Sequence, residues 1–184
     1  MKNIAIIGSG GHASSLIDLI NSSKKFKIFG YFDKIKNSNI KLKYLGDDNK
    51  ITNYKINFAA MGIGLGLSPR KKSELIKKYL KIGLSFPKLI HKNSYVSKSS
   101  IIEEGAQIFA GAIVNANTKI KSYSVINTGS IIEHDCVIGE NSFVCPGSII
   151  LGSCKIGKNT VIGSRNIILP KTSILNNTFI KAKT

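Results

Sequence analysis

The chain has 184 residues, 42% of them hydrophobic, which is enough for one or two compact units. No apolar run approaches the roughly 18 residues of a membrane-spanning helix, and the sequence begins directly with a predicted strand, so we expect no membrane span, no signal peptide and a cytoplasmic location. Three cysteines, an odd number, do not suggest a disulfide framework, and no His or Cys cluster completes a metal site.

The formal net charge of +17 is large enough to raise nucleic acid as a partner. The lysines are, however, spread through both halves of the chain, no aromatic residues alternate with them in a tract, and no nucleic-acid-binding motif is present. We therefore expect no nucleic-acid partner. The positive potential is better suited to attracting small polyanionic molecules.

The first predicted elements are a strand, a glycine-rich turn and a helix. Residues 2–7 contain the apolar run Ile-Ala-Ile-Ile, which is typical of a parallel strand covered on both faces. The first glycine turn follows, with the sequence Gly-Ser-Gly-Gly-His-Ala from Gly8 to Ala13, and residues 14–22 then place Leu and Ile at helical spacing. This order brings backbone N–H groups to a helix N-terminus, where they bind a phosphate or another polar group.

A second strand is predicted at residues 27–32, and it ends at Asp33 and Lys34. Asp33 follows the first glycine turn at about the 20-residue distance of a ribose-binding acid, which raises a nicotinamide enzyme as an alternative. Three observations weaken that alternative. The strand-helix pattern stops near residue 90, His12 lies inside the glycine turn, and the rest of the chain follows a different repeat.

A third strand is predicted at residues 56–61, and a second glycine turn, Gly62 to Gly66, follows it. Ser68 and Pro69 then supply an N-cap and a first-turn proline for a helix through about residue 81. His91 is interpreted as a hydrogen-bonded hinge residue at the start of the second half. Two glycine turns and an acid at the carboxyl ends of parallel strands form a ligand crevice.

From residue 96 onward, an aliphatic residue returns at every sixth position. These anchor residues are Val96, Ile102, Ile108, Val114, Ile120, Ile126, Ile132, Ile138, Val144, Ile150, Ile156, Ile162, Ile168, Ile174 and Ile180. Four residues after an anchor stands a small residue, with Asn166 as the one larger member: Ser100, Ala106, Ala112, Thr118, Ser124, Ser130, Cys136, Ser142, Ser148, Cys154, Thr160, Thr172 and Thr178.

This pairing is the hexapeptide repeat of a parallel β-helix. Each repeat gives a short strand whose aliphatic residue points inward, and the small residue lets the chain turn a corner. Three repeats make one coil of about 18 residues, so the stretch holds roughly five coils. We therefore predict a Rossmann-like α/β subdomain of βαβ type at residues 1–90 and a β-helix at residues 91–184. Cys136 and Cys154, one coil apart at the corner position, are expected to be buried thiols.

The whole chain resembles the bacterial sugar acetyltransferases of the sialic-acid O-acetyltransferase type, a group that includes N-acetyltransferases of nucleotide-linked amino sugars. The matching parts are the first glycine turn, Phe32-Asp33-Lys34, Ala60-Met61-Gly62, and the stretch Asn127 to Gly139 with the sequence Asn-Thr-Gly-Ser-Ile-Ile-Glu-His-Asp-Cys-Val-Ile-Gly. The resemblance implies a left-handed β-helix of hexapeptide acyltransferases, acetyl-CoA as cosubstrate without a metal, and a homotrimer whose active sites lie at subunit interfaces.

His134 is the predicted centre of the chemistry. It stands two positions past its anchor Ile132, so it should project outward, and imidazole suits the removal of a proton from an amine or hydroxyl at neutral pH. By resemblance His134 is the general base, and Asp135 orients it or raises its basicity. Ala116 and Gly152 lie one coil away on either side, which should leave space for substrates. The Gly152 N–H is a candidate oxyanion donor, with a plain turn glycine as the alternative.

The resemblance also assigns residues to the two substrates. Coenzyme A is expected in the groove between neighbouring subunits, lined by Phe143, Ser164 and Ala182 and approached by Gly152; Phe143 stands where a polar or imidazole side chain is often found. The acceptor pocket is expected to contain Gly10, Gly11, His12, Asp33, Lys34 and Gly62, with Asn127 touching the sugar.

Three interpretations of function stay open. The two glycine turns and the Asp-Lys pair favour N-acetylation of a nucleotide-linked amino sugar. O-acetylation of sialic acid or another sugar is the alternative within the same class, and a catalytically silent nucleotide-sugar-binding scaffold is the alternative of another class. Asn127 can equally be an asparagine in a corner turn.

Overall fold

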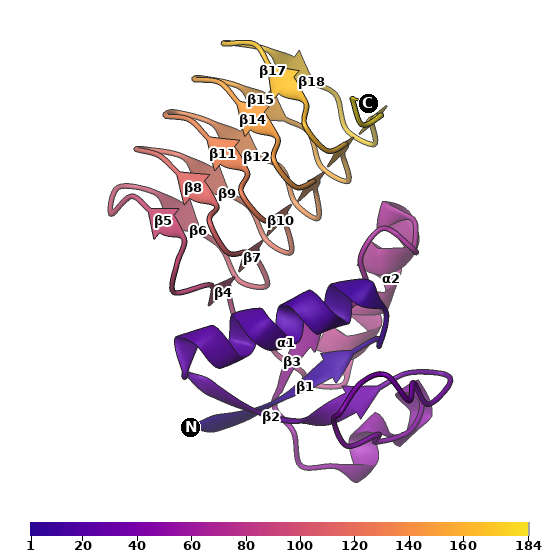
Figure 1. The fold of residues 1–184 in the computed structure, drawn as a ribbon. Coiled ribbons are helices and arrows are strands. Elements are labelled where there is room, and N and C mark those ends of the chain that lie inside the picture. Colours follow the sequence, from indigo (N-terminus) through magenta and orange to yellow (C-terminus); the bar gives the residue numbers. More distant parts are fainter. Residues whose placement is uncertain (184) are drawn as a thin grey trace. The chain divides into compact units, whose positions relative to one another are not determined.

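The computed structural model describes residues 1–183, and the chain divides into two compact units with the boundary between Pro87 and Lys88. The N-terminal unit is an α/β unit, and the C-terminal unit is a parallel β-solenoid (Figure 1). Within residues 1–183, no helix is both long and apolar enough to cross a membrane.

The N-terminal unit is built on a three-stranded parallel sheet in the order β2-β1-β3. Its elements are β1 (Lys2–Ile7), α1 (Gly11–Ser23), β2 (Phe26–Phe32), the 3₁₀-helix η1 (Asp48–Asn53), β3 (Phe58–Met61) and α2 (Pro69–Lys81). The register pairs Ile7, the last residue of β1, with Phe32 on one side and Met61 on the other. All three strands therefore end at the same edge, where the chain continues into the two glycine turns and into Asp33.

The helix starts show one difference from the sequence-based prediction. Helix α1 begins at Gly11, three residues before the predicted start, because Gly10 takes the N-cap position with an extended backbone and no side-chain cap. The glycine turn is accordingly shorter, and the first N–H groups of the helix belong to the glycine motif itself. Helix α2 begins at Pro69 as predicted, and the Ser68 hydroxyl accepts a hydrogen bond from the Lys71 N–H.

The C-terminal unit stacks short strands into three parallel sheets. The strands are β4 (Leu89–Ile90), β5 (Tyr95–Val96), β6 (Ile101–Ile102), β7 (Gln107–Ile108), β8 (Ile113–Val114), β9 (Lys119–Ile120), β10 (Val125–Ile126), β11 (Ile131–Ile132), β12 (Val137–Ile138), β13 (Phe143–Val144), β14 (Ile149–Ile150), β15 (Lys155–Ile156), β16 (Val161–Ile162), β17 (Ile167–Ile168), β18 (Ser173–Ile174) and β19 (Phe179–Ile180). Each strand pairs with the strand 18 residues away, as Ile132 does with Val114 and Ile150.

The predicted interior of the solenoid is confirmed. The anchor residues from Ile102 to Ile168 are at most 8% exposed and form one apolar cluster with the corner residues Ala106, Ala112, Cys136 and Cys154. The buried corner hydroxyls are satisfied by backbone 15 residues further on: Thr118 donates to the Glu133 carbonyl, and Ser130 to the Cys145 carbonyl. The three cysteines are free and buried, as expected for Cys136 and Cys154.

The corners share one backbone feature. At every sixth residue the backbone takes a left-handed conformation, with φ between 53° and 74°, at Gly105, Gly111, Asn117, Tyr123, Gly129, Asp135, Asn141, Gly147, Ser153, Asn159, Arg165, Lys171 and Asn177. Glycine, Asn and Asp accept this conformation most readily. Asp135 therefore occupies a corner position that suits its residue type as well as a place beside His134.

Candidate functional site

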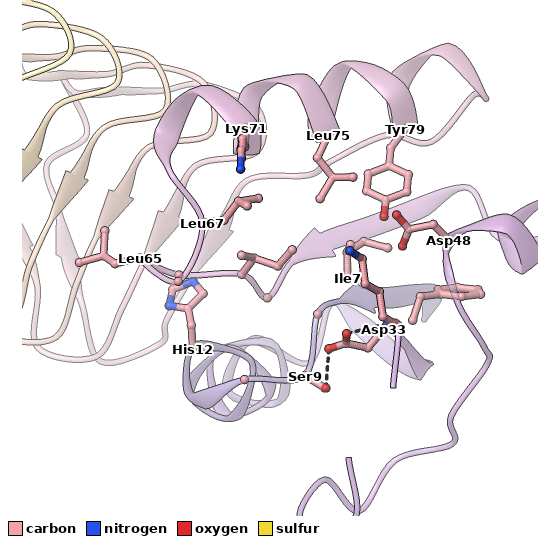
Figure 2. Close-up of a pocket in the computed structure, with 18 of the residues that line it drawn as sticks. Ile7, Ser9, His12, Asp33, Asp48, Leu65, Leu67, Lys71, Leu75 and Tyr79 are labelled. Atoms are coloured by element: carbon pink, nitrogen blue, oxygen red, sulfur yellow. Dashed lines mark hydrogen bonds between the residues drawn. The ribbon is translucent and has the colours of Figure 1, made fainter. Parts of the chain in front are cut away.

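A cavity of about 720 Å³ lies at the carboxyl edge of the N-terminal sheet. All six residues predicted for the acceptor pocket line it: Gly10, Gly11, His12, Asp33, Lys34 and Gly62. Figure 2 shows His12 and Leu65 at one end of this cavity, and Asp48 and Tyr79 at the other, with Ser9 and Asp33 between them.

The two glycine turns pack against each other. A Cβ atom added to Gly62 would stand 2.8 Å from an Ile6 methyl and 3.0 Å from the Ala13 Cβ, and one added to Gly64 would stand 3.0 Å from the His12 Cβ. Glycine is required at these positions because side chains there would push the turns apart. By contrast, a Cβ atom added to Gly10 or Gly11 would meet nothing within 4 Å, so the start of α1 faces open space.

Asp33 is held by the protein on both carboxylate oxygens. The Ser9 hydroxyl donates to Oδ2 at 2.5 Å, and the Lys34 N–H donates to Oδ1 at 2.7 Å (Figure 2). The Asn37 side-chain amide in turn donates to the Ser9 carbonyl at 2.5 Å. The acid predicted from its spacing is thus fixed against the first glycine turn, at the wall of the cavity that it lines.

The opposite wall of the cavity comes from α2 and η1, and sequence reasoning missed it. Lys71, Lys78 and Tyr79 of α2 and Asp48 of η1 all line the cavity. The Lys78 ammonium lies 3.6 Å from the Asp48 carboxylate. The α2 residues recur at helical spacing on one face, but a lysine-rich helix face is usually solvated, so spacing alone could not single them out.

Tyr79 is fully buried, and its ring points its hydroxyl toward Asp48 (Figure 2). Among the residues that the structure describes, this hydroxyl has no hydrogen-bond partner. Burial raises the pKa of Tyr79 above its ordinary value, and the nearby Asp48 carboxylate adds to the effect. Tyr79 is therefore a neutral phenol that can donate a hydrogen bond inside the cavity.

The second cluster of predicted residues lies on the solenoid. His134 projects outward as predicted: its side chain is 59% exposed and that of Asp135 is 51% exposed. The His134 Nδ1 lies 2.8 Å from the Asp135 Oδ2. The hydrogen bonds from His134, first, and from Asn117 hold the pKa of the Asp135 carboxyl below its usual range. Asp135 is therefore ionised at neutral pH and can accept the Nδ1 proton of a neutral imidazole.

The imidazole ring lies over Gly152 of the next coil. A Cβ atom added to Gly152 would stand 2.6 Å from both Cε1 and Nε2 of His134, so the ring would have to move if residue 152 had a side chain. The space predicted on this side is thus filled by the ring itself, and only glycine permits that position. Within residues 1–183, no acceptor takes up the Gly152 N–H.

The remaining predicted residues differ in how accessible they are. The Asn127 side-chain oxygen accepts from the Thr128 N–H at 2.8 Å, which is a corner-turn role. Phe143 is only 6% exposed, so it offers little surface to a ligand in a single chain. Ser164 is partly exposed and Ala182 exposed, and the two are brought together by the 18-residue register, in which the Lys183 N–H donates to the Ser164 carbonyl.

His91 is buried and hydrogen-bonded, since its Nδ1 accepts from the Asn93 N–H at 3.1 Å. The described residues contain no group of three or more His, Cys, Asp or Glu side chains arranged to hold a metal ion. The chemistry-bearing side chains therefore fall into two places, the cavity of the N-terminal unit and the His134–Asp135 pair of the solenoid.

Family models match both units. Residues 3–79 match the PglD N-terminal domain, and residues 117–152 and 135–170 match the bacterial transferase hexapeptide model of six repeats. The first match contains both glycine turns and the cavity, and the second contains His134 and Asp135. The two units are thus each of a known type.

A curated relative shares 30% identity with the chain over 113 residues: the UDP-N-acetylbacillosamine N-acetyltransferase of Bacillus subtilis (strain 168). The alignment covers 60% of this chain and 52% of the relative, so the chain spans about half the length of the protein it matches.

Solved structures match almost the entire chain. The acetyltransferase domain of PglB from Neisseria gonorrhoeae FA1090, in complex with acetyl coenzyme A, superposes with a TM-score of 0.91 at 23% identity, covering 98% of this chain and 88% of that one. A histidine-to-asparagine mutant of perosamine N-acetyltransferase from Caulobacter crescentus, in complex with CoA and GDP-perosamine, also gives a TM-score of 0.91, at 25% identity and 99% and 87% coverage. The chain thus combines a match to the PglD N-terminal domain with a match to the bacterial transferase hexapeptide repeats, and its fold is similar to those of the PglB acetyltransferase domain and the perosamine N-acetyltransferase.

Proposed function

We propose that this chain is an acetyl-CoA-dependent N-acetyltransferase that acts on a nucleotide-linked amino sugar. The observation that carries the proposal is the exposed His134–Asp135 pair, whose Nδ1 to Oδ2 distance is 2.8 Å. The perosamine N-acetyltransferase from Caulobacter crescentus, which binds CoA and GDP-perosamine in its crystal structure, supports this class of cosubstrate and acceptor.

The geometry of the pair suits a general base. Because Asp135 accepts a hydrogen bond from the Nδ1–H group, the Nε2 atom of a neutral His134 keeps its lone pair for the acceptor amine. Acetyl-CoA supplies the acetyl group as a thioester. The amine nitrogen forms the new C–N bond, the C–S bond breaks, and the amine proton passes through His134 to the departing thiolate, so protons balance.

Gly152 serves two purposes in this proposal. The absence of a side chain gives the imidazole its place, and the N–H without an acceptor is a donor for the oxygen that gains charge during attack. Ser164 and Ala182, together with Phe143, would line the coenzyme groove of a homotrimer. Light scattering on the purified protein tests the trimer. The expected molecular mass is three times the chain mass of 20.0 kDa.

The cavity of the N-terminal unit would bind the nucleotide sugar. The uncapped start of α1 faces open space at Gly10 and Gly11, which suits a phosphate approaching the backbone N–H groups closely. Lys34 and Lys71 line the same cavity and would attract a diphosphate, whereas the Lys78 ammonium already faces the Asp48 carboxylate at 3.6 Å. Asp33 and His12 line the same cavity and would lie beside this group.

A panel assay tests the proposal. The protein is incubated with acetyl-CoA and, in separate reactions, UDP-N-acetylbacillosamine, GDP-perosamine or free sialic acid, and released thiol is followed. Thiol release that depends on a nucleotide amino sugar, with the acetyl group recovered as an amide, is the expected result. Turnover of sialic acid alone would replace the proposal by O-acetylation. Nucleotide binding without any thiol release would support the silent scaffold instead.

A further inference from the structure

Asp135 contacts a second side chain besides His134, that of Asn117. Its Oδ2 atom faces His134, and its Oδ1 atom accepts a hydrogen bond from the Asn117 side-chain amide at 3.2 Å. Both carboxylate oxygens are therefore held, one by the imidazole and the other by an amide nitrogen, which can only donate. Asn117 is one coil, 18 residues, away from Asp135.

The position of Asn117 follows from the register of the solenoid. Asn117 and Asp135 occupy the same left-handed corner position in successive coils, with φ of 57° and 59°. The backbone of each is tied to the preceding coil, since the Asp135 N–H donates to the Ala116 carbonyl at 2.9 Å and the Asn117 N–H to the Ser99 hydroxyl at 3.0 Å. The backbone of Asn117 is thus held in place, and its exposed side-chain amide donates to the carboxylate one coil on.

This donor matters because the His134–Asp135 pair is exposed. With half of its side chain open to solvent, Asp135 could rotate away from the imidazole, and water would then satisfy it. The amide of Asn117 holds Oδ1 and leaves Oδ2 facing Nδ1. The carboxylate in that position requires the imidazole proton on Nδ1, so the basic lone pair is on Nε2, the atom that lies over Gly152.

We propose that Asn117 is a positioning residue, which holds Asp135 so that His134 stays in the tautomer with its proton on Nδ1. The inference rests on the proposed role of His134 as general base. Asn117 would orient the base and would contact neither substrate. Its substitution should therefore change kcat and the His134 tautomer and have little effect on KM.

Two variants test it. Asn117→Gly removes the amide and relaxes the left-handed backbone, so the fold should be retained. Asn117→Asp keeps the size of the side chain but presents an acceptor to Asp135. The matched controls are Asn159→Gly and Asn159→Asp, since Asn159 has φ of 55° and donates in the same way to Asn177 one coil on, at 3.1 Å.

The primary readout needs no substrate. The chain has three histidines, so ring ¹⁵N resonances can be assigned to His134 by comparison with a His134→Ala variant. We expect the free protein to show mainly the tautomer protonated on Nδ1, and both Asn117 variants to shift it toward the other tautomer. Turnover of acetyl-CoA with GDP-perosamine or UDP-N-acetylbacillosamine should fall about five- to tenfold in kcat for Asn117→Gly, and further for Asn117→Asp.

The outcomes separate this inference from the proposed function. An unchanged His134 tautomer in both Asn117 variants, or a fall in kcat no larger than in the Asn159 controls, would overturn the positioning role while leaving His134 as base. If His134→Ala keeps its activity, the base assignment fails first. A tautomer shift in the Asn117 variants together with an inactive His134→Ala supports both.

Discussion

The two units of this chain position their functional side chains by different physical means. In the N-terminal unit, residues far apart in the sequence, such as Ser9 and Asp33, meet because three parallel strands end in register at one sheet edge. In the solenoid, the neighbours of His134 and Asp135 are set by a fixed spacing of 18 residues. The residues that surround a site on a solenoid can therefore be predicted from their 18-residue spacing in the sequence, whereas those around a site on an open sheet depend on long-range packing.

This difference explains what the sequence could predict. The hexapeptide pattern predicted the buried anchors, the corners, the outward direction of His134 and its coil neighbours Ala116 and Gly152, because each depends only on local register. In the N-terminal unit the glycine turns and Asp33 were predicted from their motif.

The rest could not be derived from the sequence, for physical reasons. Asp48 and Tyr79 reach the cavity only through the packing of η1 and α2, which no periodicity specifies. The start of α1 was placed three residues late because glycine, a poor helix former, occupies the N-cap and first helical position. That Asn117 donates to Asp135 follows from the register, but only side-chain geometry distinguishes it from an ordinary corner asparagine.

Outside the His134–Asp135 pair itself, the largest expected effect tests the register argument on the solenoid. Gly152→Ala places a methyl group 2.6 Å from the Nε2 and Cε1 atoms of His134, so the exposed ring must move. A displacement of about 1 Å in a catalytic group costs roughly 100-fold in rate, and we expect kcat to fall by that order. Alanine keeps the backbone N–H of residue 152, so a fall in kcat would come from displacement of the His134 ring and not from loss of the oxyanion donor.

Thermal unfolding serves as the control for this variant. Only a flexible, solvent-exposed side chain opposes the new methyl, so the melting temperature of Gly152→Ala should stay close to that of the wild type. Normal turnover in this variant would mean that the observed ring position is not the reactive one.

The next effect concerns long-range packing in the N-terminal unit. Gly8 has φ of 96°, and an added Cβ would stand 2.6 Å from the Ile63 side chain of the second glycine turn. Gly8→Ala should lower the free energy of unfolding by about 2 to 3 kcal/mol, from backbone strain and from separation of the turns. Urea denaturation measures the change.

Gly83→Ala is the matched control for Gly8→Ala. Gly83 has φ of 88°, but a Cβ atom there would meet nothing within 4 Å, so this variant carries the backbone strain without the contact. Equal destabilisation of the two variants would show that the contact between the glycine turns contributes nothing.

The smallest effect is a pH dependence of the solenoid. Burial raises the pKa of the Cys136 and Cys145 thiols from 9.0 to about 11. Between these values the folded chain binds more protons than the unfolded chain, so the free energy of unfolding should fall as pH rises from about 9 to 11. The double variant Cys136→Ala and Cys145→Ala should show a shallower decline over that window in denaturation curves. A decline of equal steepness in both proteins would assign the pH dependence to other groups.

The most direct measurement is the turnover of His134→Ala with acetyl-CoA and the nucleotide amino sugar that gives thiol release in the panel. The account predicts a fall in kcat of about 100- to 10,000-fold, with the melting temperature and the binding of the nucleotide sugar preserved, because the side chain is exposed and lies on the solenoid rather than in the cavity. A variant that turns over near the wild-type rate would contradict it.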